Sequence, residues 1–317
     1  MWRGAIFMSA QALRQKYNRA FAGMEKHTRI TAWLIVGLYI LQAVLAVVVG
    51  HYLLKGDATF LSVLGIAVLM LFVATRMRGL NNIVHECSHA TFTVDRADNV
   101  RIGKVCASLL FNSFTAYRDE HLTHHKHIGD YEHDLDLQGI KNLGLHDPLT
   151  PKVVLRHITT PLMLRHLRYY LSLNLSRKDG FGFQALQYAL IGVVSIVTAL
   201  APMTGIFMLI VPFVLIYSSL MYWADCMDHA GLVPSEDDLV SSRNLLAPHV
   251  LRWLFFPRND CFHLVHHLFP HIPARHLETS HEALLADELY VSRENAVRGL
   301  RPASKPRHQG MSVTPAE

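Results

Sequence analysis

Four long apolar runs constrain the fold of this chain of 317 residues. They extend from Ile30 to Leu54, from Ala58 to Thr75, from Phe183 to Ala201 and from Met203 to Trp223. Each supplies about 18 to 25 residues, and a helix needs roughly 20 to cross a hydrocarbon core ~30 Å thick. The chain is 51% hydrophobic and only 17% charged, which is too apolar for an ordinary soluble globule. The sequence therefore predicts an all-α integral membrane protein with four transmembrane helices.

The distribution of Lys and Arg predicts the orientation of these helices. Residues 1–29, 76–182 and 224–317 carry six, fourteen and nine of the 30 basic residues, whereas the two short turns contain only Lys55. By the positive-inside rule, the three basic segments face the cytoplasm. We therefore expect a multi-pass protein with both termini in the cytoplasm, in the inner or plasma membrane if the source is bacterial. The net charge of +5 is explained by this asymmetry and by anionic headgroups, and it needs no nucleic acid.

The two ends of the chain differ from the apolar middle. Residues 1–29 carry apolar side chains at helical spacing between basic ones, which predicts an interfacial N-terminal segment, with a solvated basic arm as the alternative. The apolar set is Ala12, Leu13, Tyr17, Ala20, Phe21 and Met24. Residues 30–298 form the predicted membrane domain. Residues 299–317 are rich in Pro, Ser, Arg and Gln, which is typical of a disordered tail.

Nine of the 21 histidines are concentrated in three clusters and one nearby position. The clusters are His85-Glu-Cys-Ser-His89, His121-Leu-Thr-His124-His125 and His263-Leu-Val-His266-His267, and the additional position is His229. Residues three and four apart share one helix face, and imidazole is the commonest metal ligand in proteins. All nine follow predicted cytoplasmic ends of the helices. Nine imidazoles are too many for one metal ion and suit two, so the pattern predicts a di-metal site.

The first cluster also fits a different enzyme class. His85-Glu86-Cys87-Ser88-His89 matches H-E-x-x-H, in which two histidines hold zinc and the glutamate acts as a base. An integral-membrane zinc metalloprotease would use these residues and one further ligand. It would leave most of the other seven histidines without a role, so it is the less favoured alternative.

The four cysteines form no C-x-x-C pair. Cys87, Cys226 and Cys261 lie within a few residues of a histidine cluster, so thiolate ligation is one interpretation. Small buried side chains are the favoured interpretation, and a disulfide framework is not expected on the reducing side of the membrane.

The clusters and their surroundings resemble the membrane fatty acid desaturase superfamily. The resemblance runs from about Asn81 to Pro273, with Tyr-Arg-Asp-Glu-His-Leu-Thr-His-His-Lys-His at 117 to 127 and His-His-Leu-Phe-Pro-His-Ile-Pro at 266 to 273. It implies a four-span helical fold with a cytosolic helical cap, a non-haem centre of two Fe ions, and O2-dependent removal of hydrogen from an acyl chain. The segment Asp225-Cys-Met-Asp-His229 is similar to an Asn-x(3)-His element of the family whose histidine joins the ligands. Asp225 departs from that pattern.

The resemblance implies the following metal ligands: His85, His89, His121, His124, His125, His229, His263, His266 and His267. No separate acid or base is assigned, because the di-iron centre itself is the catalytic group. Acidic neighbours are expected to accept the second N–H of ligand imidazoles or to support the site. They are Glu86, Asp119, Glu120, Asp130, Asp134, Asp136, Asp225 and Asp228.

We therefore predict desaturation of a fatty acyl chain, in fatty acid and lipid metabolism, with hydroxylation or carotenoid-type oxygenation as alternatives. The substrate is expected to be an acyl-lipid or acyl thioester that enters from the bilayer, past candidate side chains Phe111, Phe114, Tyr222 and Trp223. The chain shows no dinucleotide fingerprint and no cysteine cluster for iron and sulfur. An external ferredoxin, rubredoxin-like protein or cytochrome would then supply electrons. Candidate residues for docking an acidic donor are Arg101, Lys104, Arg118 and Lys126.

Overall fold

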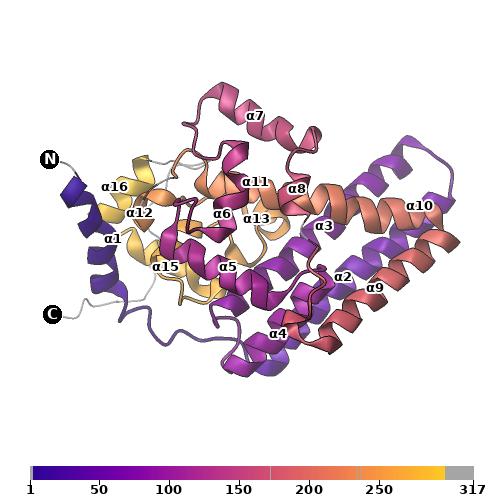
Figure 1. Cartoon of the computed structure of the whole chain (residues 1–317), viewed down its shortest axis with the longest axis horizontal. Helices are drawn as coiled ribbons and strands as arrows, with labels where there is room; N and C mark the ends of the chain where they lie inside the picture. The colour runs from indigo at the N-terminus through magenta and orange to yellow at the C-terminus, as the bar shows by residue number, and fades with distance from the viewer. Residues whose placement is uncertain (1–2, 172, 234, 236, 297–317) are drawn as a thin grey trace. The chain divides into compact units, whose positions relative to one another are not determined.

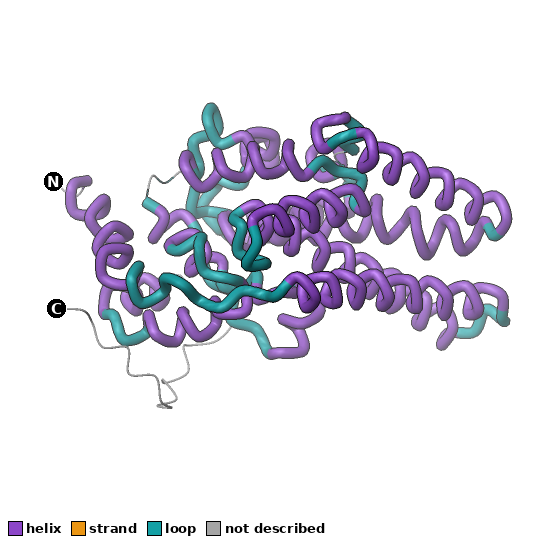
Figure 2. The backbone as a smooth tube through the Cα atoms, turned by 90° about the horizontal axis from the view of Figure 1, so that it is seen from below, coloured by secondary structure: helices purple, strands orange, loops and turns teal. Residues whose placement is uncertain are grey.

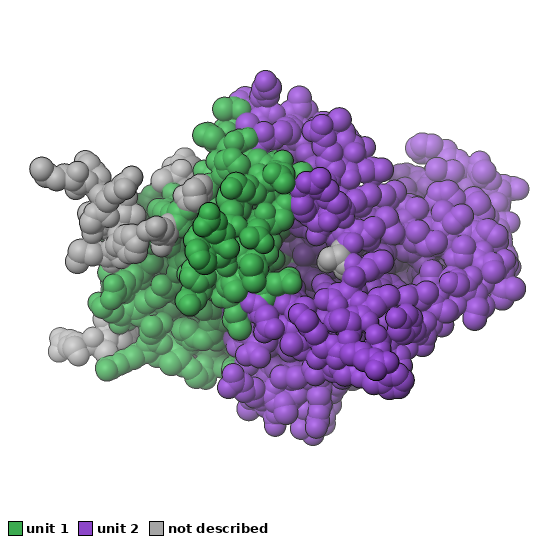
Figure 3. Space-filling model, viewed as in Figure 1, with its two compact units in different colours: residues 1–26, 120–150, 225–317 green, residues 27–119, 151–224 purple. Residues whose placement is uncertain are grey.

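The computed structural model describes residues 3–171, 173–233, 235 and 237–296. These residues form helices and irregular connections and contain no extended strand. The chain divides into two compact units (Figure 3), one of residues 1–26, 120–150 and 225–317 and the other of residues 27–119 and 151–224. We call them unit 1 and unit 2. The predicted tail at 299–317 lies outside the described residues.

Seven α-helices of the described chain lie wholly in unit 2. They are α2 Arg29–Lys55, α3 Phe60–Ser88, α4 Arg96–Leu109, α7 Pro151–Leu162, α8 Leu167–Tyr170, α9 Phe181–Leu200 and α10 Pro202–Thr204. Two helices, α5 Phe114–His127 and α11 Ser218–His229, continue from unit 2 into unit 1. The remaining helices belong to unit 1: α1 Arg3–Tyr17, α6 Leu135–Gln138, α12 Asp238–Ser241, α13 His249–Phe255, α14 His263–Leu268, α15 Leu277–Leu284 and α16 Glu288–Ala296.

Four helical segments are long and apolar enough to cross a bilayer, as predicted. They are α2, α3, α9 and the composite segment Pro202–His229, and in unit 2 they lie side by side (Figure 1, Figure 2). Two of them, α2 and α9, begin and end within two residues of the predicted spans. The other two continue past their predicted ends, α3 from Thr75 to Ser88 and the composite segment from Trp223 to His229. The protein is therefore a membrane protein of the all-α class.

Local sequence sets where the first two long helices begin. Thr28 caps α2 by accepting a hydrogen bond from the Thr31 amide, and Thr59 forms a reciprocal capping box with Ser62 at the start of α3. These side chains satisfy amide groups that the first helical turn leaves unpaired. With 29 residues, α3 is about 44 Å long, which exceeds a hydrocarbon core of ~30 Å. The helix is therefore longer than the apolar layer is thick, and His85 lies in its last turn.

The fourth apolar segment is not a regular α-helix. Residues Gly205–Ile210 and Pro212–Tyr217 are π-helical, between α10 and α11. Proline has no amide hydrogen and its ring crowds the carbonyl four residues earlier, so Pro212 disfavours a continuous α-helix at this point. The apolar pattern alone predicted the length of this segment and not its wider turns.

Close packing holds α2 against α3 in unit 2. Gly79 of α3 faces Tyr39 of α2, and a Cβ atom at Gly79 would lie 2.1 Å from the tyrosine ring. Nearby, the buried Arg76 guanidinium donates to Oε1 of Gln42 at 3.1 Å and lies over the Phe72 ring, 4.8 Å from its centroid. The two helices therefore contact through a glycine and a buried guanidinium, in addition to aliphatic side chains.

The apolar face of α1 packs inside unit 1. Leu13, Tyr17 and Phe21 are buried in a core that also contains Phe262 and Phe269. The rings of Phe21 and Phe269 meet edge to face, with 5.0 Å between their centroids. Three of the side chains predicted to enter the membrane interface therefore stabilise the protein core. Interfacial placement of residues 1–29 as a whole stays a prediction.

Candidate metal centre

Seven of the nine predicted ligands lie in unit 1, on three helix segments. The short helix α14 carries His263, His266 and His267, and its flanking residues Phe262 and Phe269 are anchored in the core of unit 1. His267 is only 1% exposed. The spacing i, i+3 and i+4 places these imidazoles on one side of α14, where His263 and His267 join one histidine group and His266 joins another.

The other four of these histidines come from the last turns of α5 and α11. His121, His124 and His125 lie on α5, and His229 is the last residue of α11. His121, His124 and His229 are buried. The histidine that stands apart from the three clusters in the sequence is therefore held at a helix end, among other imidazoles.

The first group of imidazoles consists of His124, His229, His263 and His267. Their potential ligand atoms all lie within 4.8 Å of one another. The Nε2 atom of His263 lies 2.9 Å from Nε2 of His229 and 2.9 Å from Nε2 of His267. Four imidazoles thus converge on one point inside unit 1.

A hydrogen bond at Nδ1 of His229 and a carboxylate near Nδ1 of His263 indicate why a cation fits this point. Nδ1 of His229 donates to the carbonyl of Ser241 at 2.9 Å, and Nδ1 of His263 faces the Asp228 carboxylate at 3.7 Å. A neutral imidazole has one N–H, so rings that place it on Nδ1 present Nε2 lone pairs to each other. Such lone pairs at 2.9 Å repel unless a cation lies between them. Two nitrogens bound to one metal at about 2.0 to 2.1 Å are separated by about 2.8 to 3.4 Å, and the spacing of 2.9 Å fits this geometry.

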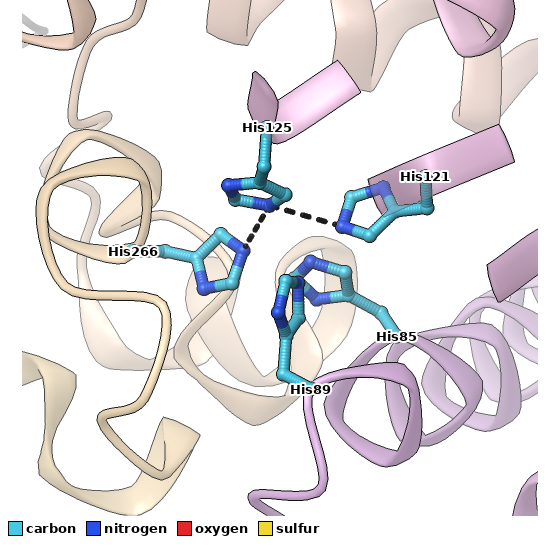
Figure 4. A group of neighbouring side chains, drawn as sticks. All are labelled: His85, His89, His121, His125 and His266. Carbon is cyan, nitrogen blue, oxygen red and sulfur yellow. Dashed lines mark hydrogen bonds between the residues drawn. The ribbon is translucent and has the colours of Figure 1, made fainter. Parts of the chain in front are cut away.

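A second group in unit 1 consists of His121, His125 and His266. Nε2 of His125 lies 3.1 Å from Nε2 of His121 and 3.0 Å from Nε2 of His266, as the dashed lines in Figure 4 show. Nδ1 of His121 faces the Asp136 carboxylate at 3.1 Å. The donor set again consists of Nε2 atoms at the spacing that two ligands of one metal ion adopt.

The remaining two predicted ligands, His85 and His89, lie in unit 2, where α3 ends. Their rings are arranged edge to face, with 5.2 Å between the centroids. Figure 4 draws this pair as well. Their spacing of four residues places both on one side of the end of α3.

Two carboxylates fix the tautomers of α5 histidines. Asp134 lies 2.9 Å from Nδ1 of His124, and both side chains are buried. The Asp134 carboxylate also accepts the amides of Gly129 and Leu137, which holds it in place. A carboxylate at Nδ1 leaves Nε2 as the metal-binding atom and makes it more basic.

The other acidic candidates occupy different surroundings. Asp225 acts on His124 through its charge, and Glu86 is buried on α3. Asp119 and Glu120 are exposed on α5. Asp130 accepts a hydrogen bond from His133, and both side chains are about half exposed.

Burial and charge set the protonation of two of these imidazoles. Burial, together with the charges of neighbouring histidines, holds the pKa of His267 well below its usual value. Burial also lowers the pKa of His124, but the hydrogen bond and charge of Asp134 outweigh it, so the pKa is raised. The imidazole of His267 is therefore neutral, whereas the charge of Asp134 favours the protonated form of His124.

The cysteine nearest the third cluster is a protonated, buried side chain. All four cysteines are buried and free. Burial raises the pKa of Cys261 to about 12. A thiol is then favoured over the thiolate that a metal would require. The candidate metal-binding atoms of unit 1 are therefore imidazole nitrogens.

Sequence reasoning did not identify the residues that hold α14. Asn244 and Arg14 bond to backbone atoms at its two ends, across sequence separations of 20 and 254 residues. No local pattern indicates either contact. The one indication in the sequence is that the apolar stretch around the third cluster is short. A short helix needs contacts with other parts of the chain to be stable.

Together, the four long apolar helices and the convergent imidazoles define a helical membrane protein with histidine groups able to hold metal ions. Residues 58–293 match the fatty acid desaturase family, and the chain belongs to that family. It is also similar to the dihydrorhizobitoxine desaturase of Bradyrhizobium elkanii, with 27% identity over 249 residues that cover 70% of this chain and 68% of the relative. The resemblance predicted from the histidine clusters is confirmed. The protein is an oxidoreductase with desaturase-type chemistry.

Proposed function

We propose that this protein desaturates fatty acyl chains in an O2-dependent reaction at a histidine-ligated di-iron centre. The observation that carries the proposal is the pairing of Nε2 atoms 2.9 to 3.1 Å apart within unit 1. Family membership supports the desaturase chemistry, and four apolar helices support a substrate that is dissolved in the bilayer. Iron is chosen over zinc because of the family, since imidazole suits both metals.

The nine histidines divide naturally into two sets of ligands. His124, His229, His263 and His267 would hold one iron. His121, His125 and His266 would belong to the other set, and His85 and His89 of unit 2 are proposed as further ligands. Such a centre supplies, when bound, the oxidising power needed to break an unactivated methylene C–H bond.

The protein's own residues would orient this centre and set its charge. Asp134 and Asp136 hold the imidazoles of His124 and His121 with Nε2 as the metal-binding atom. Buried His267 stays neutral and presents a lone pair rather than a proton. These contacts fix ligand geometry before the metal binds, which limits the reorganisation that accompanies binding.

The membrane setting leads to further parts of the proposal. The Lys and Arg asymmetry supports a cytoplasmic location for both termini and the metal centre. The acyl carrier would be a lipid or a thioester. Two electrons would come from a ferredoxin, a rubredoxin-like protein or a cytochrome, with docking candidates Arg101, Lys104, Arg118 and Lys126.

Expression in a host with a simple lipid profile tests the reaction, with acyl species compared by mass spectrometry. The wild-type chain should produce species two mass units lighter, and His124→Ala should abolish them. His133→Ala is the matched control, because this exposed histidine pairs with Asp130 on the same unit. Species sixteen mass units heavier would indicate hydroxylation in place of desaturation. Unchanged lipids would contradict an acyl substrate.

Metal analysis of the purified protein tests the centre separately. An iron-replete preparation should contain about two irons per chain. His124→Ala should lower this content, and His133→Ala should not. One zinc per chain with no iron would contradict the di-iron proposal and favour the metalloprotease alternative.

A further inference from the structure

The third histidine cluster lies on a helix that cannot hold its own position. With six residues, α14 is shorter than the helices that are stable in isolation. Its first amides and last carbonyls have no partner within the helix. Because α14 carries three proposed ligands, the groups that bind its ends and the core that buries its apolar side chains together decide where those imidazoles lie.

The amino-terminal end of α14 is held by a buried asparagine. Oδ1 of Asn244 accepts the amides of Leu264 at 3.0 Å and Val265 at 3.3 Å. Asn244 is held in turn by the hydroxyl of Tyr290, to which its Nδ2 donates at 2.8 Å. This contact fixes one end of the helix only.

The carboxyl-terminal end of α14 is held by Arg14 of α1. Nε of Arg14 donates to the carbonyl of Leu268 at 2.9 Å, and its Nη2 donates to the carbonyl of His267 at 3.1 Å. The same guanidinium forms an ion pair with Asp238. A cation at this end also interacts favourably with the helix dipole. One of the two carbonyls belongs to a proposed ligand residue.

The helix that supplies Arg14 is itself firmly placed within unit 1. Leu13 and Tyr17, on either side of Arg14 in α1, are buried in the core, and Phe21 packs against Phe269 just after α14. Arg14 therefore reaches α14 from a fixed base. It also lies outside residues 58–293, the part of the chain that matches the family.

We propose that Arg14 is a positioning residue for the metal centre, which acts through the end of α14. The inference rests on the proposed function, in which α14 carries metal ligands. Loss of the guanidinium would free the carbonyls of His267 and Leu268 and let the last turn of α14 fray. The His267 imidazole would then move relative to His124 and His229. The amino-terminal helix is accordingly part of the machinery that retains metal.

Arg14→Gln tests this role, with Lys16→Met as the matched control. Lys16 lies on the same helix and forms an ion pair at 2.7 Å with Asp287, a residue between α15 and α16. The two basic side chains are 35% and 49% exposed. Both substitutions remove one cation and one ion pair from α1, but only Arg14→Gln releases the end of α14.

The first measurement is metal retention by purified full-length protein during titration with a chelator. Supporting residues around metal ligands typically change metal affinity 10- to 100-fold. Arg14→Gln should therefore release metal at a chelator concentration about tenfold lower than wild type. Lys16→Met should release it at the wild-type concentration. Equal retention in all three proteins, or equal losses in both variants, overturns the proposal.

The second measurement is backbone hydrogen exchange in the metal-free protein. Amides in residues 263–269 should exchange faster in Arg14→Gln than in Lys16→Met, with the rest of unit 1 unchanged. This pattern separates local fraying from general unfolding. Arg14→Gln with wild-type exchange in this segment overturns the proposal even if metal is lost.

Two further variants separate the contacts that Arg14 makes. Asp238→Asn removes the ion pair and keeps the bonds to α14, so it should retain metal better than Arg14→Gln. Arg14→Lys preserves the charge and should recover part of the retention. If Asp238→Asn releases metal as readily as Arg14→Gln, the ion pair explains the effect and the helix end does not. A wild-type protein that binds no metal would instead contradict the proposed function.

Discussion

The Asp134 carboxylate lies 2.9 Å from Nδ1 of His124, with both side chains buried. A second pair of the same kind, Asp130 and His133, lies on the surface of the same unit at 2.6 Å. Only the buried pair includes a proposed ligand. The two pairs have the same chemistry and differ in burial. Matched substitutions in the two pairs therefore test the role of the buried carboxylate.

Asp134→Asn should weaken metal binding by about 10- to 100-fold. Asparagine caps a helix as well as aspartate does, so the start of α6 should persist while the negative charge is lost. Chelator titration of the purified protein measures the change. Asp130→Asn is the control and should bind metal as wild type does. Similar affinities for both variants would show that the charge of Asp134 does not support the site.

Asn244→Ala should lower the free energy of unfolding by about 1 to 3 kcal/mol, because it leaves two buried amides of α14 without an acceptor. Thermal unfolding in detergent measures the loss. Asn244→Asp keeps a side-chain acceptor at a helix amino terminus and should retain much of the stability. If the alanine and aspartate variants unfold alike, the contacts to Leu264 and Val265 contribute little.

The histidine clusters and the long helices were accessible from sequence because both depend on local spacing. Apolar runs fix the length of a membrane helix, and i, i+4 spacing fixes a shared face whatever surrounds it. Arg14 and Asn244 were not accessible, since each contacts backbone atoms that any residue would provide. The partners of Leu13 and Tyr17 were also ambiguous, because a membrane surface and a protein core select the same apolar face.

The pairing of acids with histidines was partly predictable. Several carboxylates near the second cluster were expected to meet imidazoles, and Asp134 and Asp136 do. Asp119 and Glu120 are closer to the cluster in sequence, yet they are exposed. Position along α5 turns them outward, while the chain after α5 folds back to bring Asp134 to His124.

Acid should destabilise the protein partly through His281. Burial lowers the pKa of His281 to about 4, against the opposing charge of Glu278. The unfolded chain binds a proton near pH 6.5, and the folded chain does so only near pH 4, so stability falls as pH decreases between these values. The full contribution is of order 3 kcal/mol. Nδ1 of His281 accepts from the hydroxyl of Tyr290 at 2.7 Å, which requires the neutral ring.

His281→Gln tests this contribution, because glutamine retains an acceptor for Tyr290 and does not titrate. Unfolding temperatures of wild type and variant should be compared at pH 7 and pH 5, at the same metal content. The wild type should lose more stability than the variant over this interval. Equal losses would assign the acid sensitivity to other groups.

Gly79→Ala should destabilise unit 2, although alanine normally favours a helix by about 1 kcal/mol. The added Cβ would lie 2.1 Å from the ring of Tyr39, so α2 and α3 would have to move apart. Gly37→Ala on α2 is the control, since nothing lies within 4 Å of its Cβ position. Thermal unfolding in detergent should show a loss for the first variant and no loss for the second. Tyr39→Ala should relieve the effect of Gly79→Ala, because it removes the ring that the new methyl group meets, and a double variant no more stable than Gly79→Ala would contradict this explanation.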